Sequence, residues 1–205
     1  MALVLQQPTD FYARTAANSM FGLAGLVTAS ISGNKIVKDY HLVDPSVRLG
    51  NKLAIALSEK YQLTTKTVMR PVNVSGWGQL PAVAQDVDLL LSVRTSYWGV
   101  GYFPTNWARY KFHHHVEVNL TDRRNNSVLA QGDCLSDATG VDKSPPSYDQ
   151  LLADDAAELK RQIADAVDMC LDEYESQLFL TAAARLPPRP KPSESPATQA
   201  SPPPY

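Results

Sequence analysis

Three consecutive histidines, His113, His114 and His115, have the residue type and spacing that come closest to a metal site in this sequence. Side chains alternate between the two faces of a β-strand. His113 and His115 would therefore share one face, about 7 Å apart, and His114 would point to the other. A His-x-His pair supplies two zinc ligands, and Glu117 or His41 is a candidate for a third. A metal-binding protein or a metal-dependent enzyme is one candidate function.

The surrounding segment, YKFHHHVEVNL, also has the pattern of an ordinary half-buried strand. Its apolar residues alternate on the face of His114, which predicts a hydrogen-bonded imidazole in the core. The pair on the other face has no third ligand at a fixed spacing in the sequence. We therefore expect no native metal and no other cofactor, and keep His113 and His115 as metal ligands only in the alternative.

Motifs for other catalytic chemistry do not occur. The sequence contains no Gly-x-Ser-x-Gly turn, no phosphate-binding glycine loop and no His-Glu-x-x-His pattern. The acidic pairs Asp154-Asp155 and Asp172-Glu173 fit the solvated face of a helix. We therefore expect a protein that is not an enzyme and has no catalytic residues.

Aromatic residues beside glycines form the strongest functional pattern. Trp77 lies in the stretch GWGQLP, and the stretch SYWGVGYFPTNW contributes Tyr97, Trp98, Tyr102 and Trp107. Tyr and Trp dominate the hot spots of protein interfaces, so these five residues are predicted to form a binding surface. The alternative is that they close the open end of the core.

Cys134 and Cys170 are the two cysteines of the chain, and they do not form a Cys-x-x-Cys pair. Their spacing argues against a zinc ribbon and against a thioredoxin-type motif. In an exported protein such a pair predicts one disulfide, which would stabilise the fold by about 4 kcal/mol in the chain-entropy description. Two unrelated buried thiols are the alternative.

The helices that position these residues can be located from hydrophobic periodicity. A helix is predicted over residues 45–61, because Asp44 is a good N-cap and Pro45 suits the first helical position. Upstream, residues 9–40 are predicted to be mostly helical, with a break at Ser32-Gly33-Asn34 before a second short helix.

Period-two patterns after this helix predict four strands. The first, within residues 64–74, contains Pro71 and is therefore expected at a sheet edge or exit. The second covers about residues 87–98. The third and fourth, 107–120 and 127–137, flank the polar turn TDRRNN in the manner of a β-hairpin. Short connections between the four favour an antiparallel meander.

The last predicted helix begins with a capping box, Ser147 with Gln150 three residues on. Its charged face should meet water and its apolar face should pack on the sheet. Cys170 falls on the apolar face and can reach Cys134 at the end of the last strand, which favours the disulfide. The apolar stripe comprises Leu152, Leu159, Ile163, Val167, Cys170, Tyr174 and Leu178.

These elements predict one α+β domain over residues 1–182, with an antiparallel sheet of about four strands and helices packed on one face. A chain of 205 residues is long enough for one such core. Residues 183–205 are rich in proline and are predicted to form a disordered tail. The alternative for the tail is a ligand for a proline-binding groove.

Composition excludes several classes of protein. The net charge of −2 and the scattered basic residues argue against a nucleic-acid partner. No apolar run is long enough for a transmembrane helix. The longest candidate, MFGLAGLVTASISG at residues 20–33, is predicted as a buried helix or turn; the alternative is a patch that faces a membrane surface or a partner.

The segment FGLAGLVTASISGNKIVKDYHLVDPSVRLGNKLAIALSEKYQL, with strands and a long acidic helix after SYDQLLADDAAEL, resembles uncharacterised bacterial envelope lipoproteins of the outer-membrane type. The resemblance covers most of residues 20–175. It implies a periplasmic domain held to the outer membrane by a lipidated N-terminal cysteine, and it implies no reaction. This chain has no cysteine near its N-terminus, so a leader and lipobox would have been replaced by Met1.

We therefore expect a non-enzymatic periplasmic lipoprotein-type domain that binds or helps to assemble other cell-envelope components. The expected partner is an envelope protein. It would be bound through the aromatic surface or through the glycine-rich residues 20–33. The outer membrane would be reached through a lipid anchor that this chain does not contain.

Overall fold

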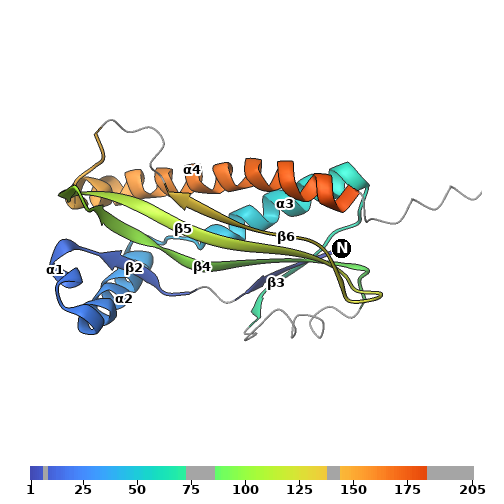
Figure 1. Ribbon diagram of the computed structural model, residues 1–205, viewed down its shortest axis with the longest axis horizontal. Helices are drawn as coiled ribbons and strands as arrows, with labels where there is room; N and C mark the ends of the chain where they lie inside the picture. The colour runs from blue at the N-terminus through green and yellow to red at the C-terminus, as the bar shows by residue number, and fades with distance from the viewer. Residues whose placement is uncertain (7–8, 73–85, 138–143, 184–205) are drawn as a thin grey trace, which may run out of the picture.

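The computed structural model describes residues 1–6, 9–72, 86–137 and 144–183. A mixed sheet carries two helices, α3 and α4, along one face, and α1 and α2 lie at one end of an elongated molecule (Figure 1). The α+β class and the helices on one face are confirmed. Trp77 and the predicted tail, residues 183–205, lie outside the described residues, except for Ala183 at the end of α4. The elements in order are β1 Ala2–Gln6, β2 Phe11–Arg14, α1 Ala16–Ser19, α2 Gly22–Asp39, α3 Pro45–Tyr61, β3 Lys66–Val72, β4 Leu89–Phe103, β5 Asn106–Asp122, β6 Ser127–Asp137 and α4 Tyr148–Ala183.

The strands β4, β5 and β6 form the predicted antiparallel meander. β4 and β5 pair over almost their whole length, and β5 and β6 are joined by the predicted polar turn. β3 lies at the edge of the sheet, as Pro71 predicts. The strand order is β3-β1-β4-β5-β6, with β2 also beside β4.

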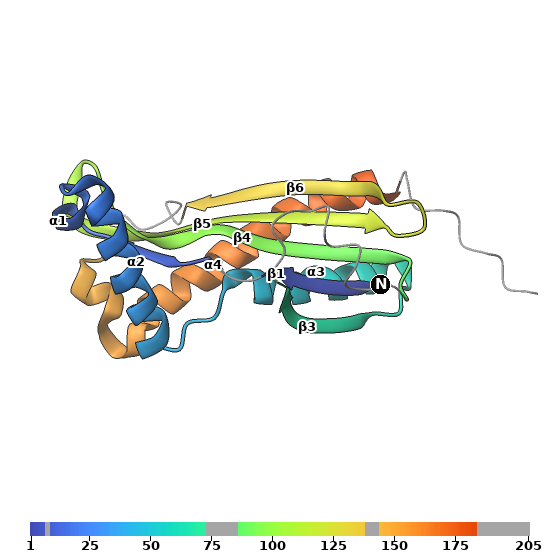
Figure 2. The same cartoon turned by 90° about the horizontal axis from the view of Figure 1, so that it is seen from below.

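Two short N-terminal strands make the sheet larger than predicted. β1 and β2 both pair with β4 in parallel, β1 at residues 90–93 and β2 at residues 98–101, so they follow one another along one edge of β4 (Figure 2). Every residue of β1 is buried, so it lacks the alternation that marks a strand. The expectation of helix at residues 11–14 is wrong for β2.

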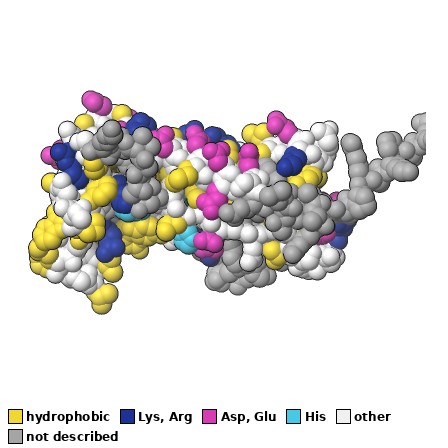
Figure 3. Space-filling model, turned by 45° about the horizontal axis from the view of Figure 1, so that its top comes forward, with side chains coloured by type: hydrophobic (Ala, Val, Ile, Leu, Met, Phe, Trp, Pro, Cys, Tyr) yellow, Lys and Arg dark blue, Asp and Glu magenta, His cyan; other side chains and the backbone are white. Residues whose placement is uncertain are grey.

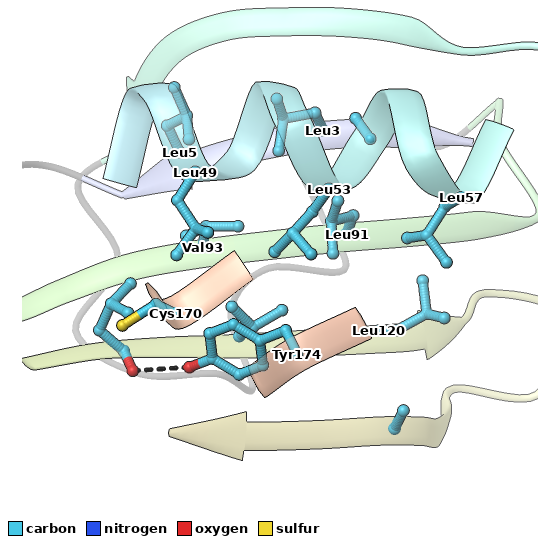
Figure 4. Packing of buried hydrophobic residues seen from close by; sticks show 14 of the residues in the cluster. Leu3, Leu5, Leu49, Leu53, Leu57, Leu91, Val93, Leu120, Cys170 and Tyr174 are labelled. Atoms are coloured by element: carbon cyan, nitrogen blue, oxygen red, sulfur yellow. Dashed lines mark hydrogen bonds between the residues drawn. The ribbon is translucent and has the colours of Figure 1, made fainter. Parts of the chain in front are cut away.

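Helix α3 matches its predicted bounds. Asp44 caps it through the backbone N–H of Ser46, and Pro45 occupies the first turn. Its apolar face packs on β1 and β4, where Leu49 and Leu53 lie against Leu3 and Leu91 in the main core (Figure 4).

Helix α4 starts at the predicted capping box, in which Ser147 and Gln150 exchange hydrogen bonds of 2.9 and 3.2 Å. The predicted uninterrupted stripe is wrong near its start. Residues 153–156 leave helical geometry, and Asp154 and Asp155 adopt left-handed backbone angles that Asp tolerates better than most residues. Beyond this kink Leu159, Val167, Cys170 and Tyr174 of the predicted face are buried, and Cys170 forms the predicted disulfide with Cys134.

Helix α2 runs without the predicted break at residues 32–34. It packs on the outer edge of β2, and Gly33 is needed there because a Cβ would lie 1.9 Å from the carbonyl oxygen of Phe11. Asn34 accepts the N–H of Phe11 at 3.1 Å, and Asn18 donates to the carbonyl of Ala13 at 2.8 Å. Side chains from the two helices thus satisfy backbone groups on the edge of β2.

Candidate functional site

His114 lies in the core, as its place in the alternation predicts, with none of its surface exposed. The expectation of a hydrogen-bonded imidazole is wrong, because neither ring nitrogen has a partner among the described residues. Burial, together with the nearby His115, lowers the pKa of His114 to about 4. The imidazole is therefore neutral at physiological pH, beside the ring of Phe112.

His113 and His115 lie on the opposite face of β5 and are both half-buried. Nδ1 of His115 is 2.7 Å from the hydroxyl of Ser96, and Nε2 is 3.5 Å from a carboxylate oxygen of Asp133. Within the described ranges, no three His, Cys, Asp or Glu side chains are grouped closely enough to hold a metal ion. The metal alternative thus gains no third ligand from this part of the chain.

Trp98 is a core residue and not part of a binding surface, which corrects the prediction. Its side chain is only 3% exposed. The indole N–H donates to the carbonyl of Thr9 at 2.9 Å, and the ring meets Phe11 edge-to-face at 4.9 Å. The sequence pattern does not show this because β2, whose Phe11 packs against Trp98, is not predicted.

Tyr97 and Tyr102 lie on the wall of a hollow of about 400 Å³ in the sheet. Trp107, which is 56% exposed, meets Tyr102 edge-to-face at 6.4 Å. The structure thus brings two of the predicted aromatic residues together with one of the predicted histidines. The residues that line this sheet hollow are Arg14, Tyr97, Gly101, Tyr102, Pro104 and His113.

A second surface lies on α2 and the turn before it. Five large apolar side chains there are each more than half exposed, and we call them the apolar corner. Residues 20–33 include no charged side chain, and Figure 3 shows hydrophobic side chains gathered at the end where α1 and α2 lie. The apolar corner comprises Met20 (70% exposed), Phe21 (70%), Leu23 (83%), Val27 (61%) and Ile31 (67%).

The expectation that this segment is buried is wrong because its small residues face inward. Gly25, Ala29 and Gly33 recur every four residues and are buried against the protein. Leu23, Val27 and Ile31 recur with the same spacing, so they form a second row that points outward. The two rows could have been read from the sequence, but the usual rule places the larger residues inside. Among the described residues, no helix is both long and apolar enough to cross a membrane.

A groove runs beside the apolar corner between α1, α2 and the start of α4. Its volume is about 360 Å³, and its α2 wall is made of small side chains, Ala24, Thr28 and Ser32, with Phe21 at one end. Small side chains at helical spacing allow another chain to approach closely. On α2, the apolar corner therefore forms a ridge, and the groove beside it forms a trough.

No protein-family model matches the sequence, and no curated protein matches it. Among solved structures, the chain is similar to a Helicobacter pylori protein described as a neuraminyllactose-binding hemagglutinin homolog, with a TM-score of 0.39, 8% identity, and coverage of 89% of this chain and 85% of that chain. It is similar to lipoprotein GNA1162 from Neisseria meningitidis, with a TM-score of 0.31, 11% identity and coverage of 86% and 99%. It is also similar to the hypothetical protein CT253 from Chlamydia trachomatis, with a TM-score of 0.32, 11% identity and coverage of 86% and 97%. The solved structures similar to this chain therefore include a bacterial lipoprotein, at low sequence identity.

Proposed function

We propose that this chain is a non-enzymatic binding domain of the bacterial cell envelope and that the apolar corner binds another envelope protein. One observation carries the proposal: five large apolar side chains on an uncharged helical segment are exposed together. Contiguous exposed apolar surface of this kind marks interaction sites, whereas exposed apolar residues that occur singly are ordinary.

The proposed compartment is the periplasm, with attachment to the outer membrane as a lipoprotein. The disulfide between Cys134 and Cys170 supports an oxidising compartment, since such bonds persist in exported proteins and are rare in the cytosol. The resemblance of the sequence to envelope lipoproteins supports the attachment.

The shape of the surface favours a protein with an apolar helix or strand as the partner. The outward row Leu23, Val27 and Ile31 is a ridge beside a trough of small side chains, an arrangement into which the side chains of a partner can interdigitate. Each large apolar side chain that becomes fully buried contributes about 1.5–3 kcal/mol, so losing two of them should weaken binding more than tenfold.

The test is recovery of partner proteins from a bacterial envelope extract on the immobilised chain. The double substitution Leu23→Ser and Val27→Ser should reduce recovery of a specific partner at least tenfold. Ile55→Ser is the matched control, since Ile55 is 59% exposed on α3 and lies outside the apolar corner. Equal recovery by the double variant and the unsubstituted chain would reject the apolar corner as the binding surface.

A further inference from the structure

The sheet hollow is a candidate ligand site in addition to the apolar corner. It draws on three strands and one turn: Arg14 comes from β2, Tyr97 and Gly101 from β4, Pro104 from the β4–β5 turn, and His113 from β5. Its volume, about 400 Å³, lies within the range of sites that hold small molecules.

Gly101 of β4 leaves part of the hollow's lining without a side chain, and a second glycine of β4, Gly99, lies two residues before it. At Gly99 a Cβ would lie 2.2 Å from the carbonyl oxygen of Tyr12, so the packing of β2 requires glycine. At Gly101, a Cβ would meet only the ring of His113 among the described residues, at 3.1 Å from Nε2. Backbone packing therefore does not require glycine at position 101.

Glycine inside a strand weakens the strand and commonly marks a place where a ligand approaches the backbone. Gly101 pairs in register with Arg14 of β2 and Lys111 of β5, so it lies between two neighbouring strands, two residues before the end of β4. The role left for Gly101 is to keep this part of the hollow open beside the ring of His113.

The charged groups that line the hollow indicate that a ligand should be an anion. Arg14 is exposed and its positive charge acts on Tyr97, whose own ring stacks on Tyr12 at 5.7 Å. Burial raises the pKa of Tyr97, so its hydroxyl remains protonated and able to donate. The lining described above includes one guanidinium and no carboxylate.

We propose that the sheet hollow binds a small organic anion whose carboxylate or phosphate is attached to a ring. The guanidinium of Arg14 has the fork geometry that pairs with either anionic group. The rings of Tyr97, Tyr102 and His113 line the hollow and are suited to contact with the ring of the ligand. This site is separate from the apolar corner and does not depend on the proposed envelope partner.

The test is a titration followed by the backbone amide signals of Gly99 and Gly101 in NMR spectra of the full chain. Benzoate and phenyl phosphate are the probes and separate the two anionic groups; acetate supplies the anion alone and benzyl alcohol the ring alone. We expect saturable shifts of both glycine signals with at least one probe at concentrations up to about 10 mM, and at least tenfold weaker binding of acetate and benzyl alcohol.

Arg14→Gln should weaken binding of the effective probe at least tenfold, while Arg48→Gln, at an exposed arginine on α3, should leave it unchanged. Gly101→Ala should also weaken binding, and an unchanged unfolding midpoint would show that the fold is intact. The proposal is overturned if neither probe shifts the two glycines, if the ring alone binds equally well, or if Arg14→Gln binds like the unsubstituted chain.

Discussion

Cys134 on β6 and Cys170 on α4 are joined by a disulfide with their Cα atoms 5.7 Å apart. One turn further along α4, the hydroxyl of Tyr174 donates to the carbonyl of Val116 at 2.8 Å, a bond drawn in Figure 4. A covalent bond and a buried hydrogen bond therefore attach the same side of α4 to neighbouring strands of the sheet.

Loss of the disulfide should destabilise the protein without changing its fold. Replacing Cys134 and Cys170 with alanine should lower the free energy of unfolding by about 2–4 kcal/mol, because the unfolded chain regains the freedom of the closed loop. Urea unfolding followed by circular dichroism measures the difference. The unsubstituted protein under reducing conditions is the control and should unfold at a similar urea concentration; a difference below about 0.5 kcal/mol would contradict a stabilising role.

His114 should make stability depend on pH in a defined window. Its pKa in the fold is about 4, below the ordinary value near 6.5, so the unfolded chain binds more protons between these values. Stability should therefore fall as the pH drops through this window, and His114 should account for about 2 kcal/mol of the loss between pH 7 and pH 4.5.

The variant His114→Leu isolates this contribution, since carboxylates also titrate at low pH. Urea unfolding of both proteins at the two pH values should show a smaller loss in the variant by about 2 kcal/mol. At pH 7 the variant should be at least as stable, because the two ring nitrogens it removes have no partner among the described residues. Parallel pH profiles for the two proteins would contradict the assignment.

Gly33→Ala should disturb the contact between α2 and β2. The added Cβ would lie 1.9 Å from the carbonyl oxygen of Phe11, so the helix must move, at a cost of about 1–3 kcal/mol. Amide hydrogen exchange at Phe11 and Ala13 should become faster. Ala24→Val, at an exposed position on the same helix, is the matched control and should leave that exchange unchanged.

Substitutions in the apolar corner should leave stability almost unchanged. Leu23 is 83% exposed and Val27 is 61% exposed, so the fold already leaves both in water. Leu23→Ser and Val27→Ser together should change the free energy of unfolding by less than about 1 kcal/mol. A larger loss in urea unfolding would mean that these side chains support the fold and would weaken the case for a binding surface.

Elements that carry a clear local signal in the sequence, such as a helix cap or strict alternation, are predicted correctly. The Asp44-Pro45 start predicts α3, and the alternation around His114 predicts which side chains of β5 face the core. β1 was missed because burial on both faces removes alternation. The prediction that residues 20–33 are buried is wrong because the contact of α2 with β2 requires Gly33, whereas the larger residues of α2 remain exposed.

The candidate sites are predictable only in part, because they depend on contacts between residues that are far apart in the sequence. Tyr97, Tyr102 and His113 were identified as chemically capable, but nothing in the sequence brings Arg14 beside them. That neighbour depends on the parallel pairing of β2 with β4, which joins residues far apart in the chain. Trp98 is predicted at the surface because β2, whose Phe11 packs against it, is not expected from the sequence.

The side-chain bonds from Asn18 and Asn34 to β2 have a consequence for how α2 can be used. If α2 moved away, the backbone N–H of Phe11 would lose its bond to Asn34, and the edge of β2 beside Gly33 would be uncovered. Such an edge is a template for intermolecular β-pairing and aggregation. The partner proposed above would therefore bind α2 where it lies on β2. One side of this helix thus carries the proposed binding surface, and the other side covers the edge of β2.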